Sequence, residues 1–89
     1  MSIASSETVR NVVAVLGDAL ALSPEVTASL ERDTGLFGSL PELDSMAVAT
    51  VLTALEDRFH ILIDDDEVTG ELFETVASLA DFVAGKLGA

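Results

Sequence analysis

Apolar residues recur at spacings of three and four in three stretches of the chain, which is typical of amphipathic helices that bury one face. These stretches are residues 6–22, residues 45–59 and the segment that follows Thr75. The expected core positions are Val9, Val12, Val13, Leu16 and Leu20 in the first stretch, Val48, Leu52, Leu55 and Phe59 with Val51 beside them in the second, and Val76, Leu79, Phe82, Val83 and Leu87 in the third. The pattern therefore predicts three longer helices.

Residues that favour helix ends stand at the borders of these stretches. Ser5 or Ser6 precedes the first, Asp44 the second and Thr75 the third, and a side-chain oxygen there can accept hydrogen bonds from free backbone N–H groups. The carboxylate of Asp44 is also favoured by the positive end of the helix dipole. Gly88 follows the last stretch and predicts its end.

The connecting segments predict the rest of the fold. Residues 23–43 form a long connection whose leucines indicate packing on the core, and Ser23-Pro24 favours a short helical turn at its start. The apolar run at residues 61–63 has no second strand to pair with, so it is predicted to be an extended loop packed into the core. A short third helix is predicted at residues 70–74. The fold class is all-α: a small four-helix bundle with a long loop between helices 1 and 2, in a single domain spanning residues 1–89.

The net charge of the chain limits the kinds of partner that the protein is expected to bind. The 89 residues include 16 acidic and 4 basic side chains, for a net charge of −12, and no cysteine. Such a field repels nucleic acid and anionic membranes and favours proteins that present basic patches. The first ten residues lack the pattern of a signal peptide, and the charge-free stretches at residues 11–17 and 45–55 are too short to span a bilayer. We therefore expect a cytoplasmic protein without a membrane span, and a monomer.

The spacing of residues along the chain argues against both a hydrolytic site and a calcium-binding loop. A hydrolytic Ser45 would need a base, but the single histidine, His60, lies 15 residues along, or about 22 Å on a continuous helix. A calcium loop starting at Asp65 has Gly70 at its sixth position but Val76 at the twelfth, where a glutamate is required. The prediction is that the protein is not an enzyme and holds no metal.

Ser45 remains a candidate for modification. Because Asp44 already caps the helix, Ser45 supplies an additional hydroxyl in the first turn, where its oxygen should point to solvent. A phosphate ester on that oxygen would face free N–H groups and the positive end of the helix dipole. The sequence therefore favours a serine that can carry a phosphate group.

The stretch LDSMAVATVLTALEDRFHILI resembles the modification region of acyl carrier proteins, in which Asp-Ser-Leu opens the second helix. LERDTGLFG is similar to the family's long first loop, and FETVASLADFV to its last helix. The resemblance implies that a phosphopantetheinyl transferase attaches 4′-phosphopantetheine from coenzyme A to Ser45, making a phosphoprotein whose arm holds acyl groups as thioesters. Asp44 would help to position a cation and the arm, and Met46 would lie under the arm.

The resemblance also implies surfaces for partners and cargo. Acyl-transferring or acyl-ligating enzymes would dock on Met46, Ala47, Thr50, Glu56 and Asp57, and an acyl chain would be sheltered by Val51, Leu55 and Ile61. In contrast to the family, AVATVLTAL after Met46 carries no charge, which favours a specialised polyketide, lipid, exopolysaccharide-related or amino-acid-loading carrier over one for general fatty acid biosynthesis. A peptidyl or aminoacyl carrier of the same fold, or an unmodified helical interaction module, remains an alternative.

Overall fold

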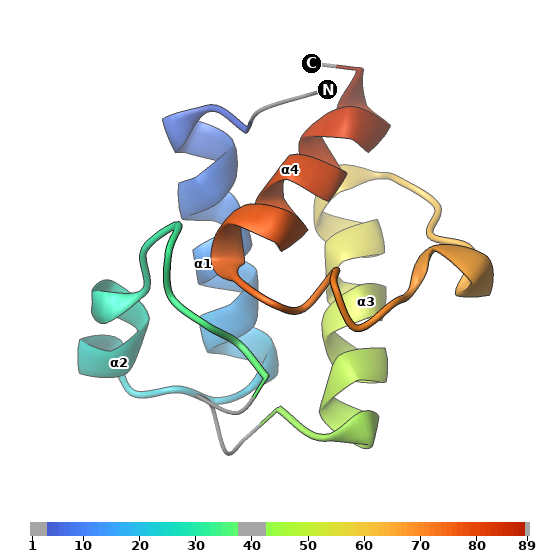
Figure 1. The fold of residues 1–89 in the computed structure, drawn as a ribbon. Helices are drawn as coiled ribbons and strands as arrows, with labels where there is room; N and C mark the ends of the chain where they lie inside the picture. The colour runs from blue at the N-terminus through green and yellow to red at the C-terminus, as the bar shows by residue number, and fades with distance from the viewer. Residues whose placement is uncertain (1–3, 38–42, 89) are drawn as a thin grey trace.

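The computed structural model describes residues 4–37 and 43–88, and these residues form helices with loops between them. The elements are α1 (Ser6–Ala19), α2 (Pro24–Ser29), α3 (Ser45–Phe59), the 3₁₀ helix η1 (Asp65–Glu67) and α4 (Val76–Leu87) (Figure 1). The predicted packing of the leucine at position 40 lies outside the described residues. The predicted all-α bundle is confirmed, with α2 as its short fourth helix.

Side chains predicted to cap the helices do so. Ser5 accepts a hydrogen bond from the Thr8 N–H at the start of α1, and Thr75 accepts one from the Ser78 N–H at the start of α4. At the other ends, His60 and Gly88 adopt left-handed backbone conformations, with φ angles of 55° and 76°, that terminate α3 and α4. The single histidine of the sequence is therefore an exposed helix terminator.

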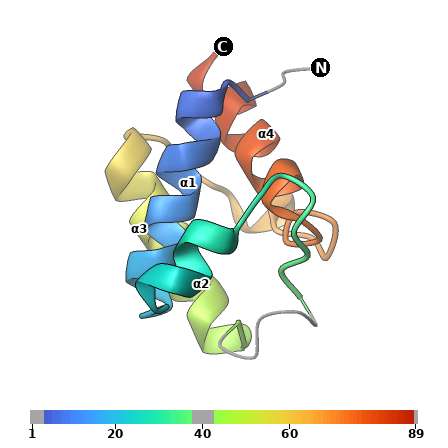
Figure 2. The ribbon, with the colours of Figure 1, turned by 90° about the vertical axis from the view of Figure 1, so that its left-hand side faces the viewer.

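Helix α1 is the centre of the bundle. It packs against α2, α3 and α4, whereas α3 and α4 approach each other closely at few backbone positions. Figure 2 shows α2 lying across α1 on one side of the molecule, with α3 and α4 behind. The largest side chains without exposed surface in the described core are Val12, Leu16, Leu36, Val51, Leu55, Phe73, Val76, Leu79 and Val83.

The long connection after α2 is held against the start of α4. The N–H groups of Val76 and Ala77, which have no partner within α4, donate to the carbonyls of Thr34 and Arg32 at 3.0 and 2.9 Å. In return, the Leu36 N–H donates to the Glu74 carbonyl at 3.1 Å. This exchange satisfies the free end of α4 and fixes the loop along its N-terminus (Figure 1).

The predicted helix at residues 70–74 is wrong. The segment forms consecutive turns, and the short helical element instead lies earlier, at η1. The carbonyls of Phe73 and Glu74 accept from the N–H groups of Phe37 and Leu36, and the Leu72 carbonyl accepts from the Ser78 hydroxyl at 3.0 Å. Inside the segment the N–H groups of Leu72 and Glu74 bond three residues back, to the carbonyls of Thr69 and Glu71, which makes turns and not an α-helix, and Gly70 lowers the helix propensity.

Three details of the other predictions also change, one of which is that Leu87, predicted as a core position, is 44% exposed because it lies at the end of α4. Helix α1 ends at Ala19 and not at residue 22, because Ala21 adopts a φ of 53° and the Leu22 N–H bonds back to the Gly17 carbonyl at 2.9 Å. In α3, the buried positions are Val51 and Leu55. The residues predicted as the stripe beside them, Val48, Leu52 and Phe59, are half-buried and pack around this pair.

Candidate functional site

The N-terminus of α3 is fixed by residues on both sides of its first turn. Leu43 is buried, and it anchors the chain just before the helix. The Asp44 carboxylate accepts from the Ala47 N–H at 2.8 Å, and the Asp44 carbonyl accepts from the Val48 N–H at 2.9 Å. Ser45 follows as the first residue of the helix and is exposed, as the sequence predicts.

The electrostatics of this turn suit an anion on the serine. The first N–H groups of an α-helix have no intrahelical acceptor, and Asp44 takes up the one that belongs to Ala47. An ester oxygen on Ser45 would therefore lie beside free N–H groups and the positive end of a helix of 15 residues. A phosphate fits this position, and the adjacent carboxylate gives a nearby ligand for a cation that would reduce their repulsion.

The five residues predicted to dock partners occupy different environments. Met46 is 83% exposed, Thr50 and Asp57 are exposed, and Ala47 is partly buried. Thr50 donates its hydroxyl to the Met46 carbonyl at 3.2 Å, so its methyl group is the part available to a partner. The Glu56 carboxylate accepts from the Ile63 N–H at 2.9 Å and thus supports the loop after α3.

The three residues predicted to shelter an acyl chain lie in the core. Val51 and Leu55 have no exposed surface, and Ile61 is 8% exposed. They come from α3 and the loop that follows it, and they belong to the single hydrophobic cluster that joins the helices. An acyl chain would therefore need these side chains to separate before it could enter.

The exposure of Leu62 was not predicted from the sequence. The run Ile61-Leu62-Ile63 was predicted to pack into the core as a unit, but Leu62 is 81% exposed. In extended backbone, neighbouring side chains point to opposite sides, so burial of Ile61 directs Leu62 outward. The alternation of side chains in an extended segment was the signal that could have predicted this exposure.

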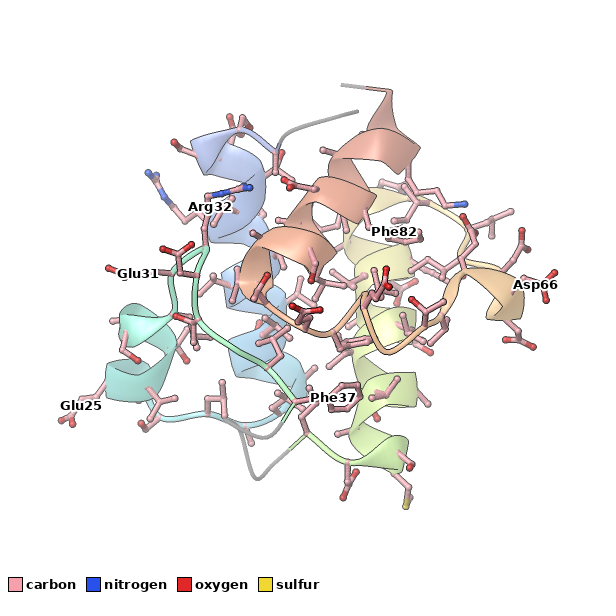
Figure 3. The ribbon with its side chains drawn as sticks, viewed as in Figure 1. Glu25, Glu31, Arg32, Phe37, Asp66 and Phe82 are labelled. Atoms are coloured by element: carbon pink, nitrogen blue, oxygen red, sulfur yellow. The ribbon has the colours of Figure 1, made fainter. Side chains whose placement is uncertain are left out.

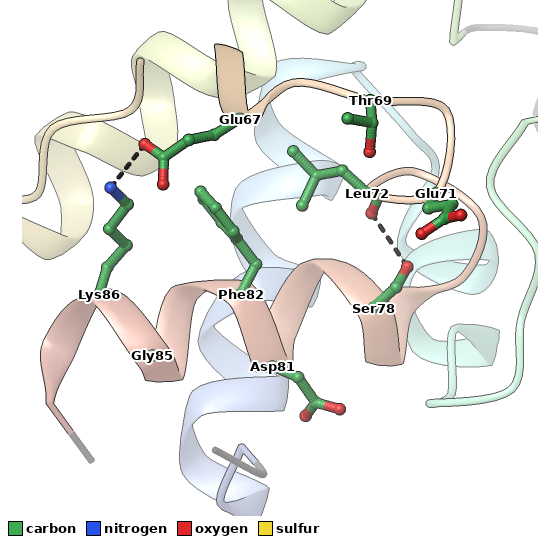
Figure 4. Close-up of a pocket in the computed structure, with 9 residues that line it drawn as sticks. All are labelled: Glu67, Thr69, Glu71, Leu72, Ser78, Asp81, Phe82, Gly85 and Lys86. Atoms are coloured by element: carbon green, nitrogen blue, oxygen red, sulfur yellow. Dashed lines mark hydrogen bonds and ion pairs between the residues drawn. The ribbon is translucent and has the colours of Figure 1, made fainter. Parts of the chain in front are cut away.

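An open cleft lies between α4 and the turns before it, with a volume of about 580 Å³ (Figure 4). Lys86 donates to the Glu67 carboxylate at 2.6 Å and lies 5.6 Å from the centre of the Phe82 ring. The Ser78 hydroxyl donates to the Leu72 carbonyl, so it is engaged in the turn. The polar groups of this cleft hold the chain together and provide no nucleophile with an adjacent base.

Metal-binding clusters and membrane-spanning helices are absent from the described residues. They contain no cluster of three histidine, cysteine, aspartate or glutamate side chains arranged to hold a metal ion. Within the same residues, no helix combines the length and apolar character needed to cross a membrane. The N-terminus of α3 is therefore the candidate site with the clearest chemistry.

Comparison with known proteins gives this site its context. The family model described as a phosphopantetheine attachment site matches residues 10–83. A solution structure of the holo acyl carrier protein from Nitrosomonas europaea is 47% identical, covers 91% of this chain and 96% of that chain, and has a TM-score of 0.84. The chain belongs to the acyl carrier protein family. No curated protein sequence matches it.

Membership of the acyl carrier protein family defines the cofactor. It is 4′-phosphopantetheine, bound covalently, and the carrier presents what this arm holds to other enzymes. The exposed hydroxyl and free N–H groups at the start of α3 fit the phosphate of such an arm. The thiol at the end of the arm supplies the thioester chemistry, and the protein determines where the arm is attached.

The carrier also contains two ion pairs among its described residues, and both should make its stability depend on pH. A hydrogen bond from Lys86 lowers the pKa of Glu67, and the paired hydrogen bonds from Arg32 lower the pKa of Asp81. Figure 3 shows Arg32 beside the upper part of α4, on which Asp81 lies. Because both carboxylates have lowered pKa values in the folded state, their stabilisation is present near neutral pH and is lost as the pH falls below about 4.

Replacement of Lys86 by methionine tests this dependence. The variant keeps an apolar stem over Phe82 but removes the charge that lowers the pKa of Glu67. We expect a lower melting temperature than wild type at pH 7, with the difference shrinking toward pH 3, when melting is followed by circular dichroism. Lys86→Arg is the control that keeps the charge. A difference between Lys86→Met and wild type that does not vary with pH would contradict the assignment.

Proposed function

We propose that the protein is an acyl carrier whose 4′-phosphopantetheine arm is attached to Ser45. The observation that carries the proposal is an exposed serine directly after the capping aspartate at the N-terminus of α3, within the segment matched by the attachment-site family. Ser45 contributes the oxygen that forms the phosphodiester, with coenzyme A as the donor of the arm. The hydroxyl proton leaves the serine, and adenosine 3′,5′-bisphosphate leaves as the other product.

Each neighbour of Ser45 has a distinct part in this function. The Asp44 carboxylate holds the first turn through its bond to the Ala47 N–H, and its outer lone pairs are available to a cation during transfer. Met46 is 83% exposed and offers a flexible apolar surface on which the arm and partner enzymes can rest. Thr50 and Asp57 extend the docking surface along α3.

Loading of the wild-type protein tests the proposal. The apo protein is incubated with coenzyme A, Mg²⁺ and a broad-specificity phosphopantetheinyl transferase, and its intact mass is measured. We expect addition of one arm, and peptide mapping is expected to find it on the peptide that contains Ser45. No added mass, or an arm on another residue, would overturn the proposal.

The cargo is proposed to be an acyl group and not an amino acid. The support is the 47% identity to a protein titled an acyl carrier, together with a net charge of −12. The loaded protein is offered to an acyl ligase with a fatty acid and, separately, to an adenylation enzyme with an amino acid. Thioester formation with the first substrate is expected; formation with the second alone would favour a peptidyl or aminoacyl carrier.

The part that Asp44 takes in arm transfer can be measured separately from its part in stabilising the fold. Asparagine caps helices about as well as aspartate does, so Asp44→Asn should retain the fold but lose the charge that favours a cation. We expect the melting temperature to change little and kcat/KM for arm transfer to fall by about 10- to 100-fold, as for groups that orient a metal site. Asp18→Asn, which changes an exposed acid on α1, is the control. Equal effects of the two variants would exclude a local role for Asp44.

A further inference from the structure

The loop between α3 and η1 presents an isolated apolar side chain to solvent. Leu62 is 81% exposed, while its neighbour Ile61 is 8% exposed and anchors the loop in the core. Single exposed leucines are common on protein surfaces, so exposure alone indicates nothing. The backbone around Leu62, however, is held by hydrogen bonds on both sides of this residue.

Hydrogen bonds fix the backbone on both sides of Leu62. The Ile61 N–H donates to the Glu56 carbonyl at 3.2 Å, and the Ile63 N–H donates to the Glu56 carboxylate at 2.9 Å. One residue later, the Asp64 N–H donates to the Glu67 carboxylate at 3.0 Å, and Lys86 holds that same carboxylate from α4. Leu62 is therefore displayed by a preorganised backbone, which lowers the entropy cost of placing it in a partner's pocket.

The surroundings of Leu62 define the surface that could cover it. Asp64, Asp65 and Asp66 follow it and are all exposed, and no basic side chain lies between His60 and Lys86. Figure 3 shows Asp66 at the outer edge of the molecule, on the side of α3 that faces away from α1 and α2. An apolar residue rimmed by carboxylates is complementary to an apolar socket rimmed by lysine and arginine.

We propose that Leu62 is a docking anchor for the enzyme that attaches the arm, a phosphopantetheinyl transferase with a basic surface around an apolar socket. The inference rests on the proposed attachment at Ser45. The 15 residues of α3 separate Ser45 from this loop by about 22 Å, which is within the roughly 30 Å width of a standard protein interface. Before loading, neither arm nor cargo contributes to binding, so contacts with the protein surface must supply the affinity for this enzyme.

Kinetics of arm transfer test the proposal. Initial rates are measured with coenzyme A, Mg²⁺ and a broad-specificity phosphopantetheinyl transferase while the concentration of apo carrier is varied. For Leu62→Ala we expect KM for the carrier to rise about tenfold, with kcat within about twofold of wild type, because the anchor is remote from the reacting oxygen. Leu62→Met should retain most of the affinity, since it keeps an apolar side chain of similar volume.

The control is Val26→Ala, which removes another exposed apolar side chain, 39% exposed, on α2, across α1 from this loop (Figure 1). It should leave both constants within about twofold of wild type. An unchanged KM for Leu62→Ala, or an equal rise for Val26→Ala, overturns the anchor while leaving attachment at Ser45 intact. A wild-type protein that accepts no arm overturns both proposals, so the two failures are distinguishable.

A second measurement does not depend on any variant. Backbone amide signals of the ¹⁵N-labelled apo protein are followed by NMR as the transferase is added. The signals of residues 61–66 should shift or broaden together with those of residues 45–50. Changes confined to residues 45–50 would exclude the loop from the interface.

Discussion

Ser45→Ala is expected to abolish arm addition completely, because the variant lacks the one oxygen through which we propose the phosphodiester forms. The substitution removes an exposed hydroxyl after a cap that Asp44 provides independently, so the fold should be retained. Intact mass after incubation with coenzyme A and transferase is the measurement. The expected result is a single mass, that of the apo protein, at times when the wild type is fully loaded.

The chain offers a closely matched control for this variant. Ser6 is also an exposed serine at the first position of a longer helix, directly after the capping residue Ser5. Ser6→Ala should be loaded at the wild-type rate, because a helix N-terminus without the adjacent Asp44 and the surface of α3 is not sufficient. Residual loading of Ser45→Ala, or loss of loading in Ser6→Ala, would show that the arm is attached elsewhere.

Phe73→Ala is expected to cause the largest loss of stability, about 3–5 kcal/mol in the free energy of unfolding. Phe73 is the largest side chain with no exposed surface, and its ring centre lies 5.7 Å from that of Phe37. Its backbone carbonyl also accepts from the Phe37 N–H, so loss of the ring leaves a cavity where the loop before residue 38 meets the turns before α4. Urea unfolding followed by circular dichroism measures the change.

Phe37→Ala is the control, since its ring is 46% exposed on the other side of the same contact. It should lose a clearly smaller part of the stability, because solvent already covers much of the ring. For a domain of this size, whose total stability is about 5–15 kcal/mol, Phe73→Ala should bring the protein close to unfolding at room temperature. Similar losses in both variants would contradict the assignment of Phe73 to the centre of the core.

The proposed site needs this core because every group around Ser45 is positioned through α3. The helix is held against α1 by Val51 and Leu55, and its first turn is fixed by the buried Leu43 and the cap at Asp44. The hydroxyl itself is free of packing constraints, which suits a position that two proteins must reach. The rigid helix thus fixes the point at which the arm is attached, while the arm itself is free to move.

The sequence alone was sufficient for features set by local interactions. The caps at Ser5, Asp44 and Thr75 were predicted because each side chain bonds to N–H groups two or three residues away. The bounds of α3 followed from its apolar periodicity and its cap. Exposure of Ser45 could be predicted for the same reason, since the first turn of a capped helix fixes which side chain points to solvent.

Only the tertiary structure decided features that depend on distant partners. The turns at residues 70–74 are held in place by Leu36 and Phe37, whose N–H groups bond to the carbonyls of Glu74 and Phe73, and no periodicity near residue 70 reveals this contact. The loop after α3 is tied to α4 by Lys86, which donates to Glu67 across 19 residues of sequence, and no local pattern predicts this pairing. Local hydrogen bonds can be predicted because both partners lie within a few residues of each other in the sequence. Contacts between segments far apart in the chain form only when the core assembles.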